Sequence, residues 1–195
     1  MRSASVPRER ATIEISELFR RYFVNTIFDS TFVVLGILAA TSAEAEPSVD
    51  FALGTVFAAC LAIGISTGVS VYEAELTEDH IRLRRIERAM LKSLEDTIIP
   101  RSLRMSRYAT SLVNFLAPLF VAFVTSLPLL MFQARLLTEF SVAAGASSGL
   151  GMGIIFVSGY YLGKLSGKKP WKKAVRMTIV ALLTFGVLLA LEHFL

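Results

Sequence analysis

Apolar residues are gathered into five stretches along the chain, and short or charged polar segments separate them. A helix rises about 1.5 Å per residue, so about twenty residues suffice to cross a hydrocarbon core of about 30 Å. Because backbone polar groups in lipid must be satisfied within the segment, each stretch is predicted to be a transmembrane helix. The predicted fold class is therefore all-α, a polytopic membrane protein with five spans. They cover residues 22–43, 51–72, 108–132, 141–163 and 174–194.

Two polar segments complete the predicted organisation. Residues 1–21 form a cytoplasmic N-terminal segment, and apolar residues at helical spacing from Arg8 to Phe23 predict an amphipathic helix on the membrane surface. Residues 22–195 form the transmembrane domain. That domain contains a cytoplasmic helical insert, residues 73–107, in which apolar positions again recur at helical spacing.

Positive charge is confined to alternate segments. Of the twenty Lys and Arg residues, nineteen lie before the first span, between spans two and three, or between span four and the first turn of span five, and Arg135 lies elsewhere. Since cytoplasmic loops carry the excess of Lys and Arg, the N-terminus is predicted inside and the C-terminus outside the cell membrane. The same cations can hold the cytoplasmic surface against anionic lipid head groups.

Composition narrows the function classes. Hydrophobic residues make up 54% of the chain, which is more than a soluble domain can hide. No basic patch interleaved with aromatic residues accompanies the net charge of +4, so nucleic-acid binding is not expected. The single cysteine, Cys60, rules out an internal disulfide and a paired-cysteine metal site. The spans contain no paired carboxylates and no nucleophile–base set, so neither an enzyme nor a bound cofactor is predicted.

One carboxylate, Asp29, lies inside an apolar span. Such a group is unfavourable by several kcal/mol unless it is paired or faces water, which makes it a candidate functional residue. Asn25 lies four residues earlier and shares its helix face. Thr67, Ser70 and Asn114 lie at a similar depth in spans two and three. This polar layer predicts either a hydrated ion site open to the cytoplasm, or hydrogen bonds that hold neighbouring helices together.

Prolines and glycines in spans three and four add two further expectations. Pro118 and Pro128 each free a backbone carbonyl one turn earlier, which can coordinate a cation or be satisfied by a nearby Ser or Thr. Gly145, Gly149 and Gly153 recur every four residues. That spacing lets helices approach closely, either within the monomer or across a dimer.

An acidic group follows span two. Its carboxylates are hard oxygen ligands that suit a divalent cation, and His80 adds a nitrogen. Ion pairs at helical spacing, such as Glu78 with Arg82, instead predict an ordinary solvated helix. The candidate metal ligands of this group are Glu73, Glu75, Glu78 and Asp79.

The order of these features over residues 18–195 resembles the vacuolar iron transporter family. The features are a surface helix, an Asp in the inner third of span one, a span two ending in a Tyr and acidic residues, a proline-containing span three and a glycine-rich span four. The family has Asp-Gly where this chain has Asp29-Ser30. It has Ser-Met-x-x-Gly-Glu-Tyr-x-Ser in the stretch that begins at Ser66, where Thr67 replaces the Met and Val71 replaces the Glu.

The resemblance implies a homodimer that moves Fe²⁺ or Mn²⁺ out of the cytosol in exchange for protons, for metal homeostasis. Asp29 would bind the ion and the proton, Thr67 and Ser70 would complete the site, and the acidic group would deliver cations at the cytoplasmic mouth. With oxygen ligands in place of the Met, the site suits Mn²⁺ as well as Fe²⁺. The family's long glutamate-rich metal-binding domain is shortened here to residues 73–107. The alternative function is a non-transporting membrane scaffold or metal sensor that acts through that segment.

Overall fold

Every element in the described part of the computed structural model is an α-helix, and all five helices are long and apolar enough to cross a membrane. The structure describes the backbone of residues 5–44, 46–90, 98–167 and 169–194, and the side chains of residues 22–44, 46–90, 103–167 and 169–191. The prediction of an all-α fold with five membrane-length apolar helices is confirmed. The helices are α1 (Ser5–Ala43), α2 (Val49–Met90), α3 (Ile98–Gln133), α4 (Phe140–Leu165) and α5 (Pro170–Phe194).

The two polar segments that were expected to be helical are extensions of the spans. α1 runs without a break from Ser5, so no separate surface helix precedes span one; the side chains of residues 5–21, on which the amphipathic prediction rests, lie outside the described residues. Residues 73–90 continue α2 and residues 98–107 begin α3, while residues 91–97 are outside the described part. The sequence from Tyr72 to Met90 contains no Gly or Pro to end the helix.

The length of α2 places its charged half beyond the membrane. The helix has 42 residues. At about 1.5 Å per residue it measures about 63 Å, which is twice the thickness of the hydrocarbon core. Because the apolar stretch ends at Tyr72, the part that begins at Glu73 extends outside the membrane-spanning segment.

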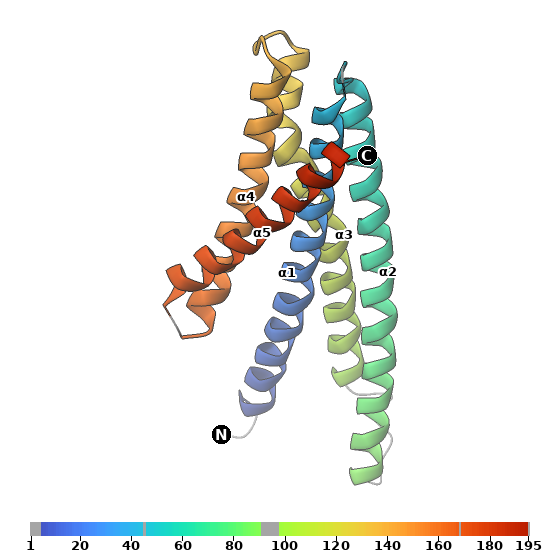
Figure 1. Ribbon diagram of the computed structural model, residues 1–195. Coiled ribbons are helices and arrows are strands. Elements are labelled where there is room, and N and C mark those ends of the chain that lie inside the picture. Colours follow the sequence, from blue (N-terminus) through green and yellow to red (C-terminus); the bar gives the residue numbers. More distant parts are fainter. Residues whose placement is uncertain (1–4, 45, 91–97, 168, 195) are drawn as a thin grey trace.

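The helices form a bundle around α1. Figure 1 shows α2 and α3 lying side by side and α4 paired with α5, and α1 contacts each of the other four helices. One end of the bundle holds the start of α1, the C-terminal end of α2, the N-terminal end of α3 and the turn between α4 and α5. This is the arrangement expected of helices that cross a membrane in alternate directions. Half of the most apolar stretch of α1 is buried, but only 11% of the most apolar stretch of α5, so α1 is the central helix and α5 is peripheral.

The core lies between the middle parts of α1, α2, α3 and α4. Leu35 and Leu38 of α1 are among the largest fully buried side chains, and Leu38 belongs to one buried cluster with Val56 of α2 and Val121 of α3. Ala143 completes this cluster from α4. The small size of the α4 contribution lets that helix lie close to the centre.

Glycines set the distance between helices of each pair. A Cβ atom on Gly64 would lie 2.6 Å from the carbonyl oxygen of Phe115, and one on Gly163 would lie 2.5 Å from the Cα of Pro170. Those two positions therefore admit only glycine without a shift of backbone. In contrast, Cβ atoms on Gly145, Gly149 and Gly153 would meet no heavy atom within 4 Å outside their own helix backbone. The repeat that was predicted to pack thus faces outward in this chain, and its role across a dimer stays a prediction.

The variant Gly64→Ala is expected to destabilise the bundle by about 1–3 kcal/mol, because the new methyl group forces α2 away from the Phe115 backbone. Thermal unfolding of the detergent-purified protein measures the change. Gly54→Ala on the same helix is the matched control, since its Cβ meets nothing within 4 Å, and it is expected to be neutral or stabilising by up to about 1 kcal/mol. Equal melting temperatures for the two variants would contradict the assigned close approach.

Candidate functional site

The polar layer of the bundle is centred on Asn114 of α3, whose side chain is completely buried. Its Oδ1 accepts a hydrogen bond from the Thr26 hydroxyl of α1 at 3.0 Å, and its Nδ2 donates to the carbonyl of Thr110 at 2.8 Å. Both ends of the amide are therefore satisfied, as a buried amide requires. The hydrogen bond from Thr26 fixes α1 against α3.

Thr67 of α2 joins the same layer through a carbonyl that a proline sets free. Pro118 has no N–H with which to bond the Asn114 carbonyl one turn earlier. The Thr67 hydroxyl lies 3.3 Å from that carbonyl and 2.8 Å from its own Ile63 carbonyl, so its one proton is shared between the two helices. Of the two expectations for the carbonyl freed by Pro118, satisfaction by a nearby hydroxyl is the one observed.

Asp29 lies on an exposed face of α1. Its Oδ2 accepts a hydrogen bond from the Asn25 Nδ2 at 3.0 Å, which confirms that the two side chains share a face. Among the described residues no cationic side chain forms an ion pair with it. Gly36, two turns further on the same face, lies 3.8 Å from Leu188 of α5, measured from the Cβ position. From that crossing α5 diverges from α1 toward its own N-terminal end (Figure 1). Asp29 is exposed.

The three residues of the predicted ion site, Asp29, Thr67 and Ser70, make separate contacts in this arrangement. Asp29 bonds within α1, Thr67 contacts α3, and Ser70 is exposed; within the described residues no hydrogen bond joins any two of the three. Thr26 is buried and bonds to α3, whereas Asp29, one turn further along α1, is exposed.

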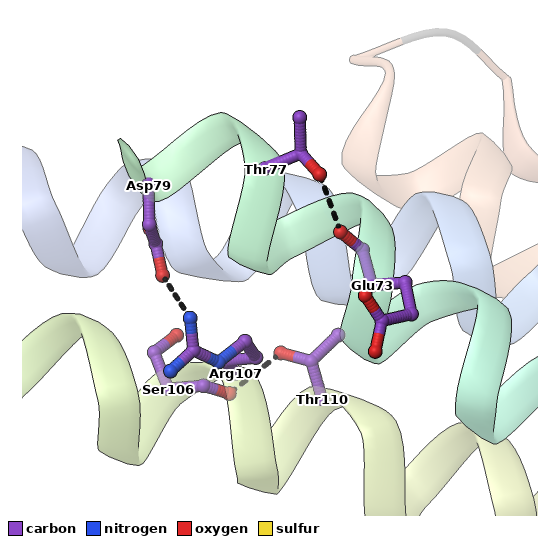
Figure 2. Close-up of polar contacts among 6 residues, drawn as sticks. All are labelled: Glu73, Thr77, Asp79, Ser106, Arg107 and Thr110. Atoms are coloured by element: carbon purple, nitrogen blue, oxygen red, sulfur yellow. Dashed lines mark hydrogen bonds and ion pairs between the residues drawn. The ribbon is translucent and has the colours of Figure 1, made fainter. Parts of the chain in front are cut away.

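A second polar cluster ties the extension of α2 to α3. The Arg107 Nη1 lies 3.3 Å from the Asp79 Oδ2, and Figure 2 shows the two side chains pointing toward each other from neighbouring helices. Arg107 is only 8% exposed, and its guanidinium carbon lies 5.0 Å from the ring centre of Tyr72. The Tyr72 ring in turn contacts the Tyr108 ring, with 5.4 Å between centroids. An ion pair and a cation–π contact thus hold the same cation.

The other acidic residues lie around this cluster. Glu73 and Glu78 are exposed, and the Glu73 carbonyl accepts a hydrogen bond from the Thr77 hydroxyl at 3.0 Å (Figure 2). Burial raises the pKa of the half-buried Glu75, and the nearby carboxylates of Asp79 and Glu78 raise this pKa further, while Arg107 lowers it. Burial also raises the pKa of Asp79, and the attraction of Arg107 offsets part of that increase.

The described residues contain no group of three or more His, Cys, Asp or Glu side chains placed to hold a metal ion. Asp79 instead pairs with Arg107, one of the nineteen cations on which the predicted orientation rests. The pairing joins positions 28 residues apart, so no local spacing indicates it. A metal role for the carboxylates of Glu73, Glu75, Glu78 and Asp79 stays a prediction.

Five membrane-length apolar helices with a polar layer between them define an α-helical multi-pass membrane protein. Neither the protein families, nor the characterised proteins, nor the solved structures compared with this chain include a match to it. The resemblance to the vacuolar iron transporter family therefore stays a prediction from residue order.

The variant Arg107→Gln is expected to destabilise the protein by about 1–3 kcal/mol, because it leaves the half-buried Asp79 carboxylate without its cation. The double variant Arg107→Gln/Asp79→Asn is expected to lose less than the sum of the single changes, with a coupling of about 0.5–2 kcal/mol in denaturant unfolding. Arg104→Gln, at an exposed position of the same helix, is the control. Strict additivity of the two single changes would show that the ion pair contributes nothing.

The raised pKa of Glu75 predicts that the stability of the folded protein depends on pH. Because its pKa is raised on folding, the folded protein binds the proton more tightly, and this contribution is lost as the pH rises through the raised pKa. Glu75→Gln is therefore expected to melt about 1–3 °C above the wild type at pH 8 and to match it at pH 4. The exposed Glu73→Gln is the matched control. A difference between Glu75→Gln and wild type that is the same at both pH values would refute the assignment.

Proposed function

We propose that this multi-pass membrane protein transports Fe²⁺ or Mn²⁺ out of the cytosol in exchange for protons, as a homodimer in the cell membrane with its N-terminus inside. The observation that supports this proposal is Asp29, a carboxylate within an apolar span and exposed on the surface of α1. A carboxylate at such a depth is unfavourable unless it faces water, a ligand or a cation, so its position supports a ligand that comes and goes.

Asp29 is the group that couples metal to proton in this proposal. The Asn25 amide holds its Oδ2 at 3.0 Å and leaves Oδ1 for an incoming ion. A carboxylate oxygen binds Mn²⁺ or Fe²⁺ when it is deprotonated and releases the ion when a proton takes its place. One side chain that holds either the metal or the proton, and not both, exchanges the two across the membrane.

The remaining ligands depend on the state of the transporter. Thr67 is committed to the contact between α2 and α3 in the present arrangement, and Ser70 is exposed on α2. Alternating access requires a second arrangement of the helices, and a shift of α1 against α2 is the movement that would bring these hydroxyls to Asp29. The exposed carboxylates of Glu73 and Glu78 raise the local concentration of cations at the end of the bundle predicted to be cytoplasmic.

The variant Asp29→Asn tests the proposal, because it removes the charge at nearly constant shape. In proteoliposomes with an imposed pH gradient, wild type is expected to carry Mn²⁺ and Fe²⁺, and Asp29→Asn is expected to fall to the level of empty liposomes. Asp50→Asn is the matched control, since Asp50 is exposed beside Gln133 and lies outside the predicted ion site. Wild-type flux in the Asp29→Asn protein would overturn the assignment.

A scaffold or metal sensor is the second candidate, and the Arg107 cluster is the observation that favours it. The ion pair with Asp79 and the contact with Tyr72 hold the α2 extension against α3 outside the apolar spans. Such a surface suits a binding partner. This function predicts binding of Mn²⁺ or Fe²⁺ to the full-length protein without any flux, so the same liposome preparation separates the two candidates.

A further inference from the structure

The outer face of α5 carries a groove that neither the proposed transport site nor the core uses. The groove is shallow and open, with a volume of about 380 Å³, and its lining comes from one stretch of the helix. Little of α5 is buried, because only 11% of its most apolar stretch lies inside the bundle. The lining residues are Trp171, Lys172, Val175, Arg176, Ile179 and Val180.

Charged and apolar residues are separated along this groove. Lys172 and Arg176 are four residues apart, so they share one face of the first two turns of α5. Ile179 and Val180 follow one turn deeper into the apolar span, and each is about half exposed. The groove is therefore cationic at the helix start and apolar further along, which is the order of polarity in a phospholipid that stands beside the helix.

The other residues at this end leave the two cations available. Lys173 donates to the Ser166 hydroxyl at 3.3 Å and so points toward the α4–α5 turn. The Trp171 ring packs edge-on against Phe156 of α4, with 5.3 Å between ring centroids. Trp residues that sit at the end of a span are typical anchors at the interface between membrane and water. The packing against Phe156 fixes the ring as one wall of the groove.

We propose that this groove binds one anionic phospholipid, whose phosphate lies between Lys172 and Arg176 and whose acyl chain lies along Ile179 and Val180. The charge of the groove supports a lipid over a second copy of the chain. A two-fold axis along the membrane normal would bring residues near the axis against their own counterparts. Lys172 and Arg176 would then face like charges, whereas an anionic head group neutralises them.

The test uses the full-length protein in detergent and native mass spectrometry, with phosphatidylglycerol and phosphatidylcholine as the added lipids. Wild type is expected to retain one phosphatidylglycerol in preference to phosphatidylcholine. Lys172→Gln/Arg176→Gln is expected to weaken phosphatidylglycerol binding roughly tenfold or more, from the loss of two cations near the head group. Binding of phosphatidylcholine is expected to stay unchanged.

Two further variants make the result specific. Lys164→Gln/Lys169→Gln removes the same charge from exposed positions at the same end that do not line the groove, and it is expected to change binding less than twofold. Ile179→Trp fills the apolar part while both cations remain, and it is expected to weaken binding as well. The proposal is overturned if wild type shows no preference for phosphatidylglycerol, if the control pair loses as much as the groove pair, or if Ile179→Trp instead converts a dimer to a monomer.

Discussion

The hydrogen bond between Thr26 and the buried Asn114 amide is the interaction on which the inner part of the bundle depends. In a bilayer, apolar contacts between helices gain little over contacts with lipid, so packing and interhelical hydrogen bonds decide the arrangement. Asn114 bonds α1 directly, and its own carbonyl lies beside Thr67 of α2. Three helices therefore meet at one residue. α4 packs against both α1 and α3, and α5 packs against α4 and α1.

The membrane architecture could be predicted from the sequence because its cause is local. Five apolar stretches of the length of a bilayer dictate five helices whatever their neighbours do. The ends of the helices were less predictable. A charged segment without Gly or Pro carries no stop signal, so α2 continues to Met90 although its environment changes from lipid to water near Tyr72.

The candidate site could be predicted only in part, because its contacts depend on which faces meet. Depth along a helix correctly placed Asn114 and Thr67 in one layer, and helical spacing correctly paired Asn25 with Asp29. The partner of Asn114 was missed. Thr26 and the neighbouring Ile27 are both buried. A single hydroxyl beside apolar residues is only a weak sign, in the sequence, of a hydrogen bond to another helix. The pairing of Arg107 with Asp79 required knowledge of how α2 and α3 lie together.

The uninterrupted course of α2 has a mechanical consequence. The helix leaves the apolar region as the same rod that crosses it, and its 18 residues from Glu73 to Met90 reach about 27 Å further. Geometry alone then makes the outer portion a lever: a tilt of about 10° inside the bilayer displaces the far tip by roughly 5 Å, given that rise per residue. Because Arg107 couples α3 to this portion, the two helices would swing together.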